Sequence, residues 1–218
     1  ASSAETDITA KALAVVREIV KETKRVRFEG NGYSEDWHKE AAKRGLPNAK
    51  NTPEALATFL EKDTTTLFER YKILCREELH AKYEIKLEAY VKTKEIELKL
   101  LKELAVTFVA PALARHIENL GSAAGRLESS AKGAGKALNA RVGGLGALLE
   151  EVYAGVLRVE ETLAKSLSEG DLTKRGKFLA SKGVEALEGL RSACDRTEEA
   201  VEHGLWSLPK YREMLFLL

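Results

Sequence analysis

Eight apolar residues recur along one stretch of the sequence at alternating spacings of four and three. They are Leu138, Val142, Leu145, Leu149, Val152, Val156, Val159 and Leu163. Such a heptad puts all eight side chains on one face of a helix and predicts a seam against another helix. The spacing resumes after the turn residues Glu169-Gly170-Asp171, at Gly183, Leu187, Leu190, Cys194, Thr197 and Val201. Two long helices joined by a short turn are therefore expected.

A further long helix is expected from about Arg76 to about Asn119, with Pro111 kinking or dividing it. The stretch Gly121 to Gly146 carries seven of the sixteen glycines and predicts a helix crossing or a flexible joint. Nearer the start, an amphipathic helix should run from about residue 7 to about residue 25. Three short helices should follow, and the expected N-caps are Asp7 for the first helix and Ser34, Thr52 and Asp63 or Thr64 for the others. The only candidate strand is a short one at residues 26–28.

These patterns predict an all-α fold, an elongated antiparallel helical bundle of about three long helices. Residues 1–75 should form an N-terminal helix and a loop-rich segment of short helices, and residues 76–204 should form the long-helix bundle. Residues 205–218 should be an apolar C-terminal tail packed back onto the rest, all within one structural domain.

Composition excludes some classes of protein. A net charge of +1 argues against a nucleic-acid partner, which requires a basic face. No apolar run approaches the roughly 20 residues of a membrane span. Two cysteines and no visible secretory signal favour the cytoplasm. Because the sequence starts with Ala1-Ser2-Ser3 and not with Met, we expect a fragment of a longer chain.

The tail LWSLPKYREMLFLL, residues 205–218, is unusually apolar for the end of a chain. Between Pro111 and Gly204 only Tyr153 and Phe178 are aromatic, so aromatic residues gather toward the two ends of the sequence. We therefore expect the tail to dock beside the loop of residues 30–37, and Leu217 and Leu218 to stay uncovered there. The candidate docking residues are Tyr33, Trp37, Trp206, Tyr211, Met214, Leu215 and Phe216.

The residues themselves show no active site. Glu77-Glu78-Leu79-His80 contains Glu-x-x-His, which a di-iron bundle would use, but such a site needs a second copy and the sequence has none. A solvated helix face is the simpler interpretation, and the same holds for the charged stretch of residues 92–102. No phosphate-binding loop and no catalytic triad is recognisable. We therefore predict no catalytic, cofactor-binding or metal-binding residue in this chain.

Several irregular strings do resemble a known family. They are FEGNGYSEDW at residues 28–37, AKRGLPN at 42–48, NTPEAL at 51–56, EELHAKYEI at 77–85, EAYVKT at 88–93 and LWSLPKYREMLF at 205–216. Together they resemble the C-terminal region of type III glutamine synthetases, while residues 119–182 match only in helical character. One departure is Lys94-Glu95, where the family carries an apolar residue and Asn, which leaves the local packing of the long helix open.

The resemblance implies a parent enzyme that joins ammonia to glutamate with ATP and Mg or Mn, built as a homo-oligomer of two hexameric rings. Its ligands for ATP, metal and glutamate would lie in an upstream catalytic domain, the expected partner of this chain. The chain would then act in inter-domain bracing and oligomer assembly. Two alternatives stay open, an independent helical adaptor or scaffold protein and a di-iron bundle enzyme.

Overall fold

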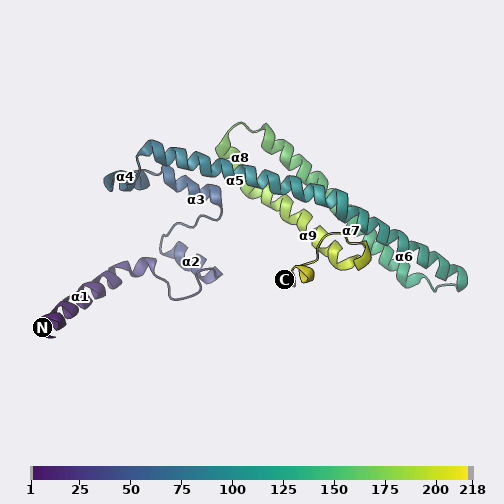
Figure 1. The fold of residues 1–218 in the computed structure, drawn as a ribbon, viewed down its shortest axis with the longest axis horizontal. Helices are drawn as coiled ribbons and strands as arrows, with labels where there is room; N and C mark the ends of the chain where they lie inside the picture. Colours follow the sequence, from purple (N-terminus) through teal and green to yellow (C-terminus); the bar gives the residue numbers. More distant parts are fainter. Residues whose placement is uncertain (1, 216–218) are drawn as a thin grey trace. The chain divides into compact units, whose positions relative to one another are not determined.

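The structure, a computed structural model, describes residues 2–215, with side chains throughout except at residues 2–7, 211 and 212 (Figure 1). The chain divides into two compact units, Ala1–Lys50 and Asn51–Leu218, which we describe separately. None of residues 2–215 lies in a strand, which confirms the all-α class. The possible strand at residues 26–28 is wrong, because a 3₁₀ turn, η1 (Thr23–Val26), occupies its start.

The first unit contains α1 (Ser2–Glu22), η1 and α2 (Glu35–Lys43). Helix α1 begins before Asp7, so Asp7 lies inside the helix and is not its N-cap. Ser34 is the N-cap of α2 as expected, since its hydroxyl accepts a hydrogen bond from the Trp37 N–H at 3.3 Å. Gly45 follows α2 with φ of +66°, a left-handed conformation that suits glycine at a helix end.

Arginine side chains hold the turn after α1 against the end of α2. The Arg44 guanidinium donates hydrogen bonds from Nη1 to the carbonyl oxygens of Lys24, Arg25 and Arg27, and from Nε to Glu40 at 2.8 Å. In return, Arg25 Nε donates to the Arg44 carbonyl oxygen at 2.8 Å. A planar guanidinium with several donors can satisfy many backbone acceptors at once, so these contacts order a segment with few buried apolar residues.

The second unit starts with α3 (Thr52–Ala57), η2 (Thr58–Leu60) and α4 (Lys62–Arg70). Two expected caps are wrong. Asn51, not Thr52, caps α3 by accepting from the Glu54 N–H at 3.0 Å, and α4 begins one residue before Asp63. Leu56 of α3 packs with two residues of the long helix that follows, Tyr83 and Leu87, and this small core joins the short helices to the bundle.

The longest helical run consists of α5 (Arg76–Leu104), a π-helical turn, η3 (Ala105–Val109), and α6 (Ala110–Ser130). The interruption expected at Pro111 is therefore the wider π turn just before it. Proline lacks an N–H and crowds the carbonyl group four residues earlier, and a wider turn relieves that crowding. The run ends at Ser130 and not near Asn119, so the first glycines of the rich stretch are helical.

Helix α7 (Lys136–Ser168) reverses the chain direction after a short turn at residues 131–135 and packs along α6 (Figure 1). A close approach explains Gly135 at this turn, because an added Cβ would lie 2.5 Å from the Ala124 carbonyl oxygen. The crossing of helices expected for the glycine-rich stretch is thus a tight helical hairpin.

The heptad of α7 faces the core as predicted. Leu145, Val152, Val156, Val159 and Leu163 are buried, and Leu138, Val142 and Leu149 are half-buried. The chain then returns through α8 (Leu172–Phe178), a second π turn, η4 (Leu179–Gly183), and α9 (Val184–Ala200). The seam that α9 continues is buried except at Leu187, which is half-buried, and Gly155 of α7 lets the two helices approach closely at Leu190.

Candidate functional site

The docking residues expected from the sequence lie in both units. In the first unit Tyr33 is 96% exposed and Trp37 is half-buried. In the second unit Trp206 is half-buried, while Met214 and Leu215 are exposed. The Tyr211 side chain and Phe216, like Leu217 and Leu218, lie outside the described residues. Docking of the tail beside residues 30–37 stays a prediction, since it concerns two units that are described separately.

Trp37 has its own partners within the first unit. Its ring stacks on Phe28 with centroids 4.6 Å apart and an angle of 30° between the planes. The Arg44 guanidinium carbon lies 5.8 Å from the same ring centroid, at cation–π distance. Trp37 therefore belongs to the arginine-held turn described above, and Tyr33 is left as the exposed aromatic residue of the loop.

The tail of the second unit packs onto the long helices. After α9 the chain forms η5 (His203–Leu205), and Trp206 and Leu208 then contact the buried core that includes Val109 and Leu190. Lys210 fixes the next bend, since its Nζ donates to the Glu198 carbonyl oxygen at 3.2 Å and lies 6.0 Å from the Trp206 ring centroid. A short helix, α10 (Tyr211–Met214), follows.

A groove of about 430 Å³ opens beside this tail. Its apolar lining comes from the end of α5, from η3 and from the tail, as Leu101, Leu104, Val109, Trp206, Leu208, Pro209 and Met214. Helix α9 supplies the opposite wall with Cys194 and with the ion pair of Arg191 and Asp195, whose N–O distance is 2.7 Å. The volume lies within the range of small-molecule sites, but the few polar groups that would orient a ligand stand on one wall only.

A buried ion pair is the main feature that the sequence did not reveal. Glu95 of α5 is only 6% exposed, and its Oε1 accepts hydrogen bonds from Arg175 Nε at 2.8 Å and from the Ser166 hydroxyl at 2.7 Å. The prediction that residues 92–102 are solvated surface is therefore wrong at Glu95. This contact also shows how the helix accommodates the departure at Lys94-Glu95, because Arg175 and Ser166 supply a charged and a hydroxyl partner from α8 and α7.

The Glu-x-x-His string forms the first turn of α5. Glu78 Oε2 accepts a hydrogen bond from the Cys75 N–H at 2.8 Å, and this contact helps to cap the helix. His80 is exposed, and its Nδ1 lies 3.7 Å from Oε1 of Glu84 on the same helix. Among the described residues, no three or more His, Cys, Asp or Glu side chains gather as metal ligands would. No helix within these described residues is long and apolar enough to span a membrane.

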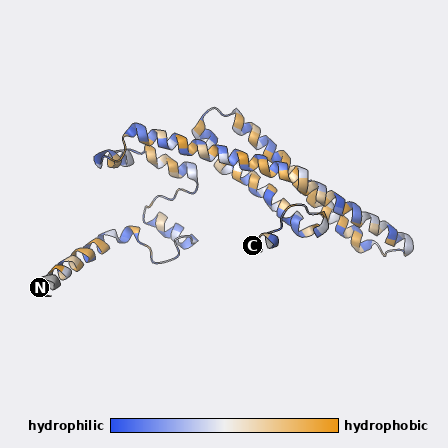
Figure 2. Cartoon of the chain, in the orientation of Figure 1, coloured by the Kyte–Doolittle hydropathy of each residue, from blue (hydrophilic) through white to orange (hydrophobic). Residues whose placement is uncertain are grey.

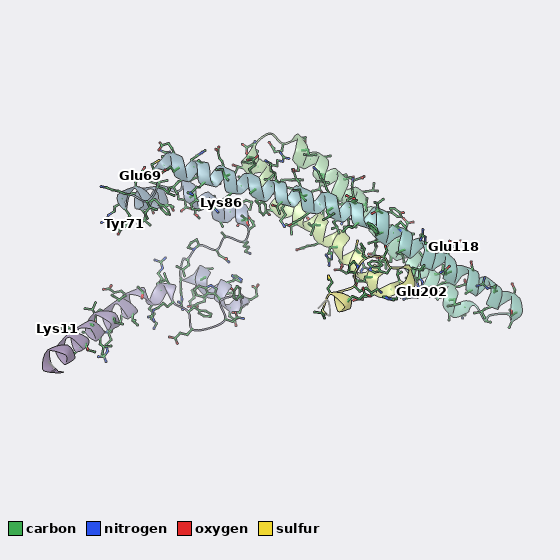
Figure 3. The ribbon with its side chains drawn as sticks, in the orientation of Figure 1. Lys11, Glu69, Tyr71, Lys86, Glu118 and Glu202 are labelled. Atoms are coloured by element: carbon green, nitrogen blue, oxygen red, sulfur yellow. The ribbon has the colours of Figure 1, made fainter. Side chains whose placement is uncertain are left out.

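The outer faces of the helices carry exposed charged and apolar side chains. Figure 3 labels Lys11 on α1, Glu118 on α6 and Glu202 after α9, all of which are exposed. Along α1, hydrophobic and hydrophilic residues are interspersed (Figure 2). The described part of that helix contains no buried residue. The described residues thus present exposed helical surfaces, a loop held by arginines and the groove beside the tail.

Comparison with known proteins identifies the family of this chain. A family model described as the glutamine synthetase C-terminal domain matches residues 11–128, which is more than half of the chain. The chain therefore belongs to the glutamine synthetase C-terminal domain family.

Similar proteins extend the match to nearly the whole chain. It is 31% identical to a glutamine synthetase of Butyrivibrio fibrisolvens and 31% identical to a type-3 glutamine synthetase of Dictyostelium discoideum. Each alignment covers 93% of this chain, but only 30% and 28% of those relatives. A glutamine synthetase of Bacteroides fragilis is 27% identical over a similar share, 93% of this chain and 28% of the relative. The chain thus spans less than a third of the length of these relatives.

Proposed function

We propose that this chain is the non-catalytic C-terminal domain of a type III glutamine synthetase, which braces an upstream catalytic domain and supports assembly of the enzyme into a homo-oligomer. The family match and the small share of each relative that the chain covers support this proposal. The parent enzyme would join ammonia to glutamate in the cytoplasm with ATP and Mg or Mn, and would bind these cofactors outside this chain.

The apolar face of α1 carries the proposal. Ile8, Val15, Val16 and Ile19 share one side of the helix, and each is more than half exposed. None of the described side chains of the first unit buries them, and a solvent-facing row of this kind is typical of a surface that contacts another part of a larger assembly. In the longer relatives a partner of that kind would be the remaining two thirds of the polypeptide.

Charge introduced on α1 tests this role in the complete polypeptide that the gene encodes. Val16→Asp and Ile19→Asp place a carboxylate on the apolar face, and we expect them to lower both the oligomer mass in sedimentation and the rate of glutamine formation. Arg17→Asp is the matched control, because it introduces the same side chain between these two residues on the opposite side of the helix. An oligomer mass and an activity unchanged in both apolar variants would rule out the bracing role of α1.

The same exposed face would equally suit an independent helical adaptor that binds another protein. The coding sequence upstream of Ala1 distinguishes the two functions. A glutamine synthetase catalytic domain in the same reading frame supports the bracing role, whereas an unrelated upstream sequence favours the adaptor.

A further inference from the structure

The groove beside α10 is apolar and large. Its apolar lining includes Leu101 and Leu104 of α5, Trp206 and Leu208 of the tail, and Met214 of α10. A volume of about 430 Å³ lies within the range of pockets that bury drug-sized molecules, so the groove has room for apolar side chains. Exposed apolar surface of this kind is costly in water, and an occupant would remove that cost.

Three residues, Phe216, Leu217 and Leu218, follow the described part of the tail. Leu215 is 79% exposed and keeps a right-handed helical backbone, with φ of −73° and ψ of −17°. In the sequence, Leu217 and Leu218 follow Met214 by three and four residues. Three residues reach at most about 10 Å, so their side chains stay close to the groove that Met214 lines.

We propose that the groove formed by α5, η3, α9 and the tail receives Leu217 and Leu218 of the same chain. This occupant matches the apolar part of the lining and needs no new element. It also removes from water the most apolar end of the sequence. The inference does not depend on the proposed function, because all of its parts lie within the second unit.

Cys194 is a natural reporter of this contact. It lines the α9 wall of the groove, and burial raises the pKa of its thiol to about 11. Since the thiolate is the reactive form, alkylation near pH 8 is slow and depends on access to the groove. The other cysteine, Cys75, is exposed and can be replaced by serine to leave a single reactive site.

The first experiment compares alkylation of Cys194 by N-ethylmaleimide in full chains that carry Cys75→Ser. With Leu217→Asp and Leu218→Asp together, we expect alkylation about tenfold faster, which corresponds to about 1.4 kcal/mol of lost docking. Leu215→Asp is the control, because Leu215 points into solvent and its replacement should leave the rate unchanged. Equal rates in the double variant and its parent, with both still melting cooperatively, would overturn the proposal.

The second experiment asks whether the contact lies within one chain. In the Cys75→Ser background, Leu217→Cys or Leu218→Cys should form a disulfide with Cys194 under mild oxidation, since bridging requires Cα atoms about 4.4–6.8 Å apart. A monomeric disulfide that reduces reversibly supports the proposal. A disulfide-linked dimer would place the segment in the groove of a second copy and overturn it, as would no disulfide at either position. Leu215→Cys is the matched control and should remain a free thiol.

Discussion

The burial of Glu95 and its distant partners could not be predicted from the sequence around it. Its neighbours in the charged stretch are mostly solvated, but Arg175 and Ser166 come to Glu95 from helices that lie 80 and 71 residues further along the chain. A carboxylate in such a place requires a partner, because an unpaired buried charge is costly. No local pattern around Glu95 could reveal that partner.

Neutralising Glu95 tests the importance of this pair. Glu95→Gln should lower the free energy of unfolding by about 1–3 kcal/mol, less than the loss of a fully buried pair because Arg175 is 24% exposed. Glu151→Gln is the matched control. The Glu151–Arg196 pair is about half exposed on both sides, so its loss should cost below about 1 kcal/mol in the same urea titration. Equal losses in the two variants would mean that the burial of Glu95 contributes nothing.

Two glycines of α7 should respond in opposite directions to alanine. At Gly155 the new Cβ would lie 3.0 Å from Leu190 Cδ1 and 3.3 Å from Leu190 Cα, so the helices must separate slightly. Overpacking costs about 1–3 kcal/mol, while better helix propensity returns about 1 kcal/mol, and we expect a net loss near 1 kcal/mol. Gly144→Ala meets nothing within 4 Å and should gain about 0.5–1 kcal/mol. Thermal melts of both variants check the signs.

At the scale of the elements, the heptad was the most informative signal in the sequence. It predicted the buried face of α7 and most of the seam of α9, because apolar periodicity depends only on local geometry. Local signals also predicted the start of the long helix at Arg76 and the cap at Ser34. It did not reveal the π turns, the helical state of Gly121 or the cap at Asn51, because tertiary packing decides these over local propensity.

The candidate site was less accessible to sequence reasoning than the helices. The distribution of aromatic residues predicted docking of the tail beside residues 30–37, which stays a prediction. The contacts of Trp206 and Leu208 with the long helices were not predicted. The groove, however, combines residues 101–109, 191–198 and 206–214, three segments that only the folded bundle brings together.

A charge in the α7 seam tests the packing of that element. Val152 is fully buried, and Val152→Asp should lower the free energy of unfolding by about 3–5 kcal/mol, as expected for an uncompensated buried charge. Leu157→Asp in the same helix is the control, since Leu157 is largely exposed and its replacement should change stability by about 0.5 kcal/mol or less. A melting temperature unaffected by Val152→Asp would show that this face meets water.

The contact of the tail with the bundle predicts a smaller effect. Trp206 is half-buried, and the indole Nε1 is buried without an acceptor among the described residues. Trp206→Ala loses apolar contacts but also removes that unpaired donor, so we expect a cost of about 1–3 kcal/mol, below that of a core tryptophan. Tyr33→Ala, at a residue that is 96% exposed, should be nearly neutral in the same denaturant titration. A cost equal to that of Tyr33→Ala would mean that the tail is loosely held.

For the whole molecule, the proposal that another part of the polypeptide carries the catalytic residues makes a direct prediction. If the ligands for ATP and metal lie in the upstream part of a longer enzyme, the isolated chain should neither form glutamine nor bind ATP tightly. Calorimetry with ATP and magnesium should then show no saturable heat, with the complete enzyme as the positive control. Stoichiometric binding in the micromolar range by the chain alone would contradict the proposal.

The hydrogen bonds that join α5 to α8 have a consequence for the order of folding. Glu95 to Arg175 and Tyr83 to Thr173 close loops of 80 and 90 residues, whereas the α6–α7 hairpin closes over the turn at residues 131–135. Because closing a longer loop costs more chain entropy, the hairpin should form first and the α5–α8 contacts last. Contacts made after the transition state slow unfolding and leave the folding rate nearly unchanged. The buried ion pair therefore governs how long the folded domain persists more than how quickly it forms.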